Sequence, residues 1–517
     1  MSLSKILKIY GPPGTGKTTT LLNLVDRSIE DGVQPSRIAF VAFSRKAAQE
    51  AKERAMKRFG FDDDSDLHFF RTLHSFAYQL SDIKQNQLMT DDHLKELGLK
   101  IGFNLTRKAS VEPEDGISAI TSAESPVMQI IQLSRLKREP VDVTYNESTI
   151  EESLQEVIYA FNSYKKYKQS LRLYDYTDIL EYFVANNGKY CPHFDVVFVD
   201  EAQDLSKLQW EMVNVIVNRS KKAYVAGDDD QAIFRWAGAD VESLLTLDSP
   251  SEVLSQSFRV PKSVHSVAEK IVSRIKNRRI KKYLPHTVQG SVNVRVSAPV
   301  DEMNKGTWLI LAQCAYMLQE ITENLRSSGV LFEYKNKRSI NFSIVTAVLA
   351  WKALQNDEEI FGTDLYHMYT WMKTNTRIKR GYKKLPNVEM NDRFKFQDLV
   401  NNMGLKADIE MNWDIALDRL PEEESSYISA LLRKGQKINE DPKIKISTIH
   451  GAKGGEAENV VVYTDISRAS DEARLSNTVE GFRISEDLHR LFYVAVTRTK
   501  ENLYLITPED AVRSYQI

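Results

Sequence analysis

The chain has 517 residues, of which 42% are hydrophobic and 27% charged, and its formal net charge is −2 at pH 7. The length excludes a single core, because domains run to roughly 100–200 residues, and the hydrophobic content excludes a disordered chain. The balanced charge carries no global electrostatic signature, although a nucleic-acid partner needs only a local basic channel.

The first predicted element is a strand that runs into a glycine-rich turn and then into a helix. The strand covers Lys5–Tyr10, and the turn reads Gly11-Pro12-Pro13-Gly14-Thr15-Gly16-Lys17-Thr18, which fits G-x-x-x-x-G-K-S/T in full. In such a turn the backbone N–H groups and the helix N-terminus surround phosphates. The motif places Lys17 at the β and γ phosphates and the Thr18 hydroxyl on Mg²⁺. We therefore expect a nucleoside triphosphate and Mg²⁺ as ligands.

Short apolar runs rich in β-branched residues recur along the rest of the chain, and helical patterns such as Lys46–Phe59 and Leu208–Val217 lie between several of them. Continuous apolar runs are typical of strands covered on both faces, as in a parallel sheet flanked by helices. The pattern predicts a doubly wound α/β fold. The further predicted strands are Arg37–Phe43, Asp195–Val199, Lys222–Ala226, Trp308–Ala312, Lys443–Thr448, Asn459–Tyr463 and Leu503–Ile506.

Two stretches interrupt this α/β rhythm. Residues 81–165 are polar and helix-like, and residues from about 337 to 440 are also mostly helical, with Trp351, Trp371 and Trp413 as expected core anchors. Both are interpreted as insertions into the α/β framework. No internal repeat, low-complexity tract or long linker is visible.

Two basic clusters fit either a nucleic-acid track or a solvated helix face. The first consists of Arg274, Lys276, Arg278, Arg279, Lys281 and Lys282, and the second of Arg377, Lys379, Arg380, Lys383 and Lys384.

The chain has two cysteines, Cys191 and Cys314, which are far apart and show no C-x-x-C spacing. This indicates a reducing compartment and argues against a zinc or iron–sulfur centre. No signal peptide and no apolar run near the ~20 residues of a membrane span is visible, so the sequence predicts a soluble, cytoplasmic protein without a membrane partner.

A second phosphate-site element is the apolar strand that ends in Asp200-Glu201-Ala202-Gln203-Asp204. It delivers the two acidic residues to the carboxyl edge of the sheet, where ligands of open α/β sheets bind. There Asp200 is placed to hold Mg²⁺ and Glu201 to orient and deprotonate the attacking water. Paired with the glycine turn, this element predicts hydrolysis of the nucleotide.

A third element, Gly227-Asp228-Asp229-Asp230-Gln231-Ala232-Ile233-Phe234-Arg235-Trp236, completes a set that resembles the UvrD/Rep/PcrA-like superfamily 1A DNA helicases. Further segments resemble the family's other motifs in the same order. They are Phe43–Ala48 (motif Ia), Arg71–Phe76 (Ib), Tyr174–Leu180, Leu254–Arg259 (IV), Ile446–Glu456 (V) and Leu491–Thr499 (VI).

The resemblance implies two RecA-like P-loop NTPase lobes of α/β fold, each with a mostly helical inserted subdomain. We expect lobe 1A to cover residues 1–80 and 166–250, with subdomain 1B inserted at 81–165. Lobe 2A is expected to cover residues 251–336 and 441–517, with a reduced subdomain 2B at 337–440.

The resemblance also assigns roles around ATP. The first lobe would supply Lys17, Thr18, Asp200, Glu201 and Gln231, and the second lobe Arg259 and Arg498 near the γ-phosphate. Phe258 matches the aromatic that stacks on the base, and Glu456 the residue that contacts the sugar. The expected nucleotide-binding set also contains Gly11, Pro12, Pro13, Gly14, Thr15, Gly16 and Thr19.

The polynucleotide track follows from the same resemblance. Phe43, Phe234 and Trp236 match positions whose rings stack on single-strand bases, a contact worth ~1–3 kcal/mol per base that tolerates any sequence. Thr72 and His74 match a position that contacts the backbone, and His450 is expected to contact DNA. For Phe43 and Phe234 a place in the core is the alternative.

Some residues depart from the family's pattern. Thr19 stands where an arginine usually follows Lys-Thr, and the glutamine element upstream of the first strand is not present, so we expect loose selectivity for the base. Ala237, Gly455 and Gln313 stand where the family often has arginine, leucine and arginine.

The sequence predicts an ATP-dependent DNA helicase or translocase that moves 3′→5′ on single-stranded DNA and tailed duplexes. We expect it to act as a monomer, with replication or repair proteins as candidate partners. Three alternatives stay open. They are a translocase that strips proteins with little unwinding, a P-loop small-molecule kinase, and a DNA-binding scaffold that does not hydrolyse ATP.

Overall fold

The computed structural model describes residues 5–43, 45–60, 67–105, 125–148, 150–385, 388–507 and 513–517. The chain forms two compact units. Unit 1 comprises Met1–Ser291, Arg468–Glu501 and Ile517, and unit 2 comprises Val292–Ser467 and Asn502–Gln516. These units differ from the predicted lobes, because residues 251–291 and 468–501 pack with the first lobe. The division into four subdomains stays a prediction.

Unit 1 is built on a six-stranded sheet in the order β3-β2-β4-β5-β1-β6, in which every neighbouring pair is parallel. Its central strands are apolar and buried along most of their length, as parallel strands covered on both faces must be. The strands are β1 (Ile6–Tyr10), β2 (Ile38–Ala42), β3 (Phe70–Thr72), β4 (Phe194–Val199), β5 (Ser220–Gly227) and β6 (Ser251–Val253).

Parallel strands bring their carboxyl ends to one edge of the sheet. Here Gly11 follows β1, Phe43 follows β2, Asp200 follows β4 and Asp228 follows β5. The register pairs Ile9 with Ala226 and Ala39 with Val197, so these ends lie level with one another. The glycine turn, the acidic segment after β4 and the segment Gly227–Trp236 therefore begin along this edge.

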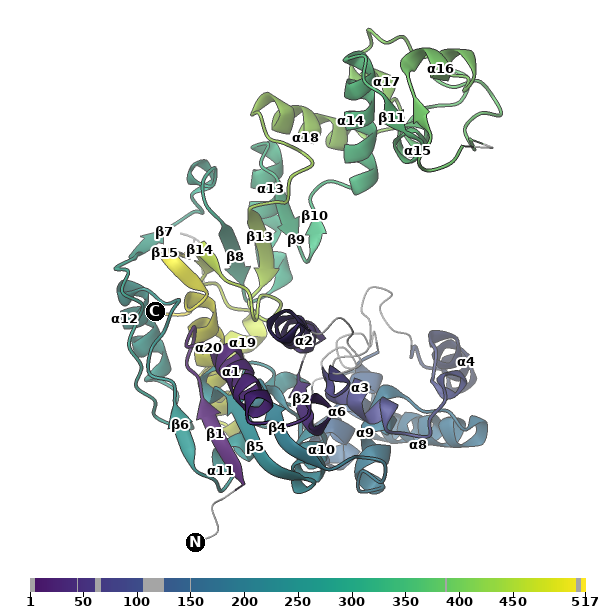
Figure 1. Ribbon diagram of the computed structural model, residues 1–517. Coiled ribbons are helices and arrows are strands. Elements are labelled where there is room, and N and C mark those ends of the chain that lie inside the picture. The colour runs from purple at the N-terminus through teal and green to yellow at the C-terminus, as the bar shows by residue number, and fades with distance from the viewer. Residues whose placement is uncertain are drawn as a thin grey trace. The chain divides into compact units, whose positions relative to one another are not determined.

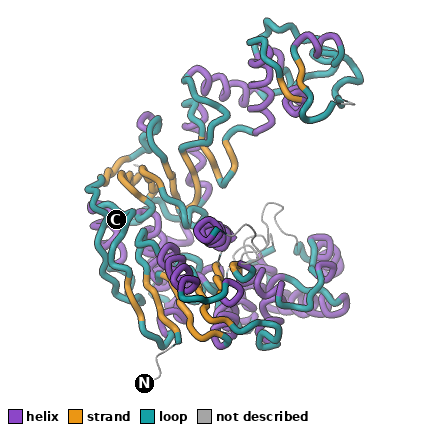
Figure 2. The backbone as a smooth tube through the Cα atoms, in the orientation of Figure 1, coloured by secondary structure: helices purple, strands orange, loops and turns teal. Residues whose placement is uncertain are grey.

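Helices α1 and α2 pack on the sheet through an apolar core that includes Leu21, Val25, Phe40, Phe198 and Tyr224. Figure 1 shows α1 beside the strands of this sheet, and Figure 2 distinguishes the helices from the strands in the same orientation. The helices of unit 1 are α1 (Lys17–Glu30), α2 (Arg45–Phe59), α3 (Leu73–Gln79), α4 (Asp91–Ile101), α6 (Pro126–Lys137), α7 (Val141–Asn146), α8 (Leu154–Leu171), α9 (Tyr176–Ala185), α10 (Lys207–Asn218), α11 (Val241–Thr246), α12 (Lys262–Val272), α19 (Arg468–Leu475) and α20 (Val479–Val496).

The first predicted insertion contains α4, α6, α7 and the first two thirds of α8, which share a core of their own. It is fastened to the sheet domain by a buried charge cluster around Asp175, which also caps the N-terminus of α9. Asp175 Oδ2 lies 2.6 Å from Arg135 Nη1 and 2.7 Å from Lys168 Nζ, and it accepts a hydrogen bond from the Tyr164 hydroxyl at 2.5 Å. Asp175, in the segment Tyr174–Leu180, therefore has a structural role, because it binds side chains of the first insertion.

Unit 2 contains a seven-stranded sheet in the order β10-β9-β13-β8-β14-β15-β7. Strand β13 is parallel to both β8 and β9, β14 is parallel to β8, and β10 is antiparallel to β9. The strands are β7 (Ser291–Arg295), β8 (Trp308–Ala312), β9 (Phe332–Tyr334), β10 (Lys337–Arg338), β13 (Ile444–Thr448), β14 (Ala457–Tyr463) and β15 (Thr499–Ile506).

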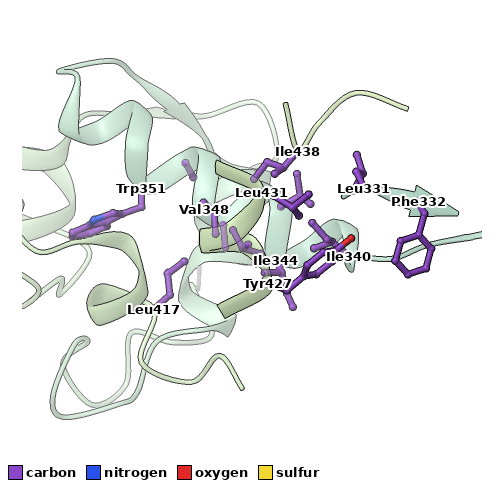
Figure 3. Close-up of a cluster of buried hydrophobic side chains, with 14 of the residues drawn as sticks. Leu331, Phe332, Ile340, Ile344, Val348, Trp351, Leu417, Tyr427, Leu431 and Ile438 are labelled. Carbon is purple, nitrogen blue, oxygen red and sulfur yellow. The ribbon is translucent and has the colours of Figure 1, made fainter. Parts of the chain in front are cut away.

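The regular elements of the second insertion are mainly helices, joined by long turns, and the insertion continues the core of the sheet within unit 2. One cluster of buried residues runs from Ile310 and Ile446 in the sheet to Trp351 in the insertion, and Figure 3 shows its side chains in a row from Phe332 to Trp351. Besides the two-stranded pair β11 (Ile360–Phe361) and β12 (Arg393–Phe394), the remaining elements are α13 (Gln319–Ser327), α14 (Phe342–Gln355), α15 (Gly362–Thr370), α16 (Phe396–Asn401), α17 (Trp413–Ala416) and α18 (Glu422–Arg433).

All eight strands predicted from apolar runs are present in the structure, with ends within three residues of the prediction except at β15, which begins four residues earlier. Trp351 is fully buried, while Trp371 and Trp413 are half-buried against the same core. Within the described residues, no helix combines the length and the apolar character that crossing a membrane would require.

Trp351→Ala tests the shared core of unit 2. The side chain has 0% exposure and its indole N–H donates to the Met411 carbonyl at 2.9 Å. We expect a loss of about 3–5 kcal/mol in the free energy of unfolding, because the substitution leaves a cavity. Urea unfolding followed by tryptophan fluorescence and circular dichroism measures it. Phe342→Ala, on the exposed side of the same helix, is the control and should change stability by less than about 0.5 kcal/mol.

Candidate nucleotide site

The glycine turn joins β1 to α1 and is closed by two residues in the left-handed region, Gly14 (φ 72°) and Gly16 (φ 77°). A Cβ atom on Gly11 would lie 1.9 Å from Lys17 Cγ, so the turn has no room for a side chain there. The Lys17 ammonium donates a hydrogen bond to the Gly11 carbonyl at 3.0 Å and lies 3.8 Å from Glu201 Oε1. The lysine is thus folded over its own turn, beside the acidic end of β4.

Other side chains of the turn have local contacts. The Thr15 hydroxyl donates to the Pro12 carbonyl at 2.8 Å, which stabilises the bend itself. Thr19, at the start of α1, accepts a hydrogen bond from Arg54 Nη1 of α2 at 3.4 Å. An arginine therefore lies next to Thr19, although it comes from a different helix than the motif pattern expects.

Asp200 and Thr18 form an oxygen pair at the end of β4. The Thr18 hydroxyl donates to Asp200 Oδ2 at 2.7 Å, and the Glu201 N–H donates to Asp200 Oδ1 at 2.9 Å. Burial, and then the neighbouring Glu201 charge, raise the pKa of Asp200 to about 6. A hydroxyl and a carboxylate are the hard oxygen ligands that Mg²⁺ prefers, and a cation would relieve the cost of burying this carboxylate. These two residues fit a magnesium ion.

A chain of hydrogen bonds connects Glu201 to Arg498. Gln203 donates to Glu201 Oε2 and accepts from the Asp228 N–H at 2.9 Å. Gln231 donates to Asp228 Oδ2 at 2.7 Å and accepts from Arg498 Nη2 at 3.1 Å. Glu201 is half-buried, and the other four side chains are buried. The candidate general base and a candidate arginine for the γ-phosphate therefore belong to one network.

Gln203 and Asp228 were missed as site residues by the sequence analysis. Both stand inside motifs quoted above, two residues after Glu201 and three residues before Gln231, so this proximity in the chain was the available signal. Their backbone and side-chain contacts, rather than their charge, make them members of the site.

The segment that carries Phe258 and Arg259 is bonded to the glycine turn. The Ser257 hydroxyl donates to the Pro13 carbonyl at 2.8 Å, and the Phe258 N–H donates to the Gly14 carbonyl at 2.8 Å. A Cβ atom on Gly14 would lie 2.4 Å from Arg259 Cβ. Phe258 keeps 71% of its surface exposed, so its ring is available to stack on a base. Arg259 and Arg498 both belong to unit 1, the unit of Lys17.

The predicted base-stacking residues lie close to this network. The rings of Phe43 and Phe234 stack on each other with centroids 5.9 Å apart and planes inclined by 24°. Phe234 is buried and Phe43 half-buried, whereas Trp236 keeps 47% of its surface exposed. Trp236 therefore has the most accessible ring of the three, and it follows Gln231 by five residues.

Thr72 and His74 are buried at the start of α3. The Thr72 hydroxyl caps this helix by accepting a hydrogen bond from the Ser75 N–H at 3.3 Å. Burial, only partly opposed by the nearby Asp175 charge, lowers the pKa of His74 to about 4. Their observed contacts are structural, and a role at DNA stays a prediction.

His450 and Glu456 lie in unit 2, in the turn between β13 and β14. His450 is half-buried and Glu456 is exposed. Their expected contacts with DNA and with the nucleotide sugar stay predictions. Gln313, one of the departures from the family's pattern, accepts a hydrogen bond from the Ser467 N–H at 2.7 Å in the same unit.

Models of two protein families match the chain. The UvrD/REP helicase N-terminal domain matches residues 1–252, and the UvrD-like helicase C-terminal domain matches residues 382–510. The chain belongs to the UvrD/Rep helicase family. Membership confirms the predicted fold class of two RecA-like lobes and the predicted enzyme class, the ATP-dependent DNA helicases.

Several relatives in this family are similar over most of the chain. A probable DNA helicase II homologue of Mycoplasma genitalium is 24% identical over 583 residues, covering 96% of this chain and 82% of the relative. Its counterpart in Mycoplasma capricolum is 22% identical and covers 98% and 82%. The ATP-dependent DNA helicase PcrA of Staphylococcus aureus is 27% identical over 301 residues, 53% of this chain and 39% of that protein.

The buried His74 predicts a specific acid sensitivity of the fold. Because its pKa is about 4 in the folded chain and about 6.5 when unfolded, the unfolded chain binds an extra proton between these values. The stability that neutral His74 contributes is complete above pH 6.5 and declines as the pH falls toward 4, by about 2 kcal/mol between pH 7.5 and 5. His74→Gln should make the measured decline smaller by this amount, and urea unfolding at the two pH values measures it.

His193→Gln, at an exposed position, is the matched control and should retain the wild-type pH dependence. An identical loss of stability in wild type and His74→Gln between pH 7.5 and 5 would contradict the assignment of a buried neutral histidine.

Proposed function

We propose that this protein is an ATP-driven, Mg²⁺-dependent motor that moves along single-stranded DNA and unwinds tailed duplexes. The observation that carries the proposal is the hydrogen bond between Gln231 and Arg498, on a segment whose Trp236 ring stays accessible. One short segment thereby touches the hydrolytic network at one end and offers a stacking ring at the other. The direction 3′→5′ rests on the motif resemblance.

The chain's own residues suggest how hydrolysis would proceed. Lys17 would exchange the Gly11 carbonyl and Glu201 for phosphate oxygens, while Thr18 and Asp200 would hold Mg²⁺, which neutralises phosphate charge. Glu201 would then be released to accept the proton of the attacking water. Arg498 would neutralise charge on the transferring phosphoryl group, a contribution of ~10³–10⁵ in rate, or roughly 4–7 kcal/mol.

Stacking suits a motor better than base-edge recognition, because every base has a π-face. Phe43, Phe234 and Trp236 supply aromatic rings near the motif that carries Gln231. A change at the nucleotide could therefore be passed to the strand through a segment of only six residues. This coupling of two sites through one element is how a switch segment works.

The decisive test is the ATPase rate with and without single-stranded DNA, together with strand displacement on duplexes that carry a 3′ or a 5′ tail. We expect stimulation by the single strand and displacement from the 3′ tail only. Glu201→Gln should bind ATP but hydrolyse it about 10²–10⁴-fold more slowly, because the general base is lost. An ATPase that ignores single strands would favour a small-molecule kinase instead, and protein removal without strand displacement would favour the stripping translocase.

Trp236→Ala tests the coupling of the strand to the nucleotide. The substitution removes a stacked base contact worth ~1–3 kcal/mol, so DNA-stimulated hydrolysis and translocation should fall more than hydrolysis without DNA. Steady-state ATPase titrations with single-stranded DNA measure both. Tyr190→Ala, at a similar exposure of 44%, is the control for loss of an exposed ring. Equal losses of the stimulated and unstimulated rates would argue against the coupling.

A further inference from the structure

Three consecutive aspartates, Asp228, Asp229 and Asp230, follow β5 and are completely buried. The carboxylates of all three contact the same cation, the ammonium group of Lys281. Lys281 Nζ lies 3.0 Å from Asp228 Oδ1 and 2.9 Å from Asp230 Oδ2, and it donates a hydrogen bond to Asp229 Oδ1. The Lys281 side chain itself has 1% exposure. This residue was a member of a basic cluster interpreted as a nucleic-acid track or a solvated helix face, and it is neither.

The neighbours of Lys281 tie the same two segments together. Arg278 makes a two-pronged contact with Asp230, with Nε and Nη2 each 2.6 Å from a carboxylate oxygen. The Arg279 N–H donates to Asp229 Oδ2 at 2.8 Å. Arg490 of α20 donates to the Asp229 carbonyl at 3.0 Å. Buried carboxylates are tolerated only while such partners stay in place, so the aspartate turn and residues 278–281 must move together.

The segment that follows Lys281 continues to the loop of Phe258 and Arg259. The Leu284 N–H donates to the Ser255 carbonyl at 2.7 Å, and the Ser257 N–H donates to the Leu284 carbonyl at 2.8 Å. That loop is in turn bonded to the glycine turn through Ser257 and Phe258. Residues 278–284 therefore bridge the aspartate turn and the segment that bears Arg259.

A second set of contacts leads from the cluster to Trp236. Arg235, its neighbour in sequence, lies 3.0 Å from Asp487 Oδ1, and Asp487 lies 3.6 Å from Arg490 Nη1. Arg490 also donates to the carbonyl of Asn277 at 2.7 Å. Ion pairs of this cluster therefore lie at both ends of the segment Gln231–Trp236. Asp228, Asp229 and Asp230 precede the segment, and Arg235 stands directly before Trp236.

We propose that Lys281 is a positioning residue that couples the strand to hydrolysis. Asp228 contacts Lys281 through Oδ1 and Gln231 through Oδ2, so the ammonium fixes the carboxylate that orients Gln231 toward Arg498. Through residues 278–284 it also fixes the aspartate turn relative to Arg259. Lys281 touches neither nucleotide nor strand and acts through these groups. This inference rests on the proposed function.

Lys281→Met tests it, because methionine keeps much of the volume and removes the charge. We expect the DNA-stimulated kcat to fall by about 10- to 100-fold, the cost of misplacing a reacting group by about 1 Å. The KM for ATP should stay within about twofold, because Lys17, Thr18 and Asp200 keep their contacts. The rate without DNA should fall less than the stimulated rate, because only the stimulated rate also depends on coupling of the strand to this network. The matched control is Lys282→Met, which changes the exposed neighbour and should leave all three values unchanged.

The ratio of stimulated to unstimulated rates separates positioning from simple instability. A variant that is only partly folded loses both rates in proportion, so an unchanged ratio would overturn the proposal.

If Lys281→Met does not fold, Arg278→Lys is measured in the same way. This variant keeps the charge at Asp230 but loses the two-pronged contact, and the ratio of stimulated to unstimulated rates is again the criterion. A wild-type ATPase that ignores single strands would overturn the proposed function together with this inference, whereas full stimulation of Lys281→Met would overturn this inference alone.

Discussion

The buried carboxylate of Asp228 is the point on which the rest of the site depends. Its two oxygens face Gln231 and Lys281, and its backbone N–H is bonded to Gln203. Each of these partners leads elsewhere: Gln203 to Glu201, Gln231 to Arg498, and Lys281 to two further aspartates. A carboxylate held in this way has very little freedom to rotate, so the groups around it keep fixed relative positions.

Such a cluster contributes little to the free energy of folding, but it fixes the relative positions of its side chains. Removing carboxylates and ammonium groups from water costs several kcal/mol per ion, and their mutual attraction offsets this cost only if every lone pair finds a partner. In a low-dielectric interior, a partly satisfied network is more costly than an apolar core. Each carboxylate oxygen of Asp228, Asp229 and Asp230 has at least one such partner, which leaves few alternative arrangements. We infer that the cluster is retained for the position it gives to Gln231 and Arg498.

Local patterns in the sequence predicted much of the fold and the chemistry, because strands buried on both faces are apolar throughout and phosphate turns require glycine. The glycine turn, the acidic end of β4 and the strand order along the chain are of this kind. The long-range contacts were beyond such patterns. Nothing in the sequence of Arg278 and Lys281 distinguishes a surface cation from one buried against aspartates 48 to 53 residues away in the chain. Likewise, Thr72 and His74 match a DNA-contacting pattern, while their burial follows from the packing of α3.

The polar groups of the nucleotide site are already bonded to one another, and this bears on how binding could produce motion. Lys17 contacts the Gly11 carbonyl and Glu201, and Arg498 contacts Gln231. A phosphate that engages Lys17 and Arg498 must replace these bonds, so the net gain is the difference between two sets of hydrogen bonds. Each replaced bond releases a partner: Glu201 for the attacking water, and Gln231 for a new orientation. Because Gln231 and Trp236 share one short segment, a reorientation of the first changes the platform on which a base would stack.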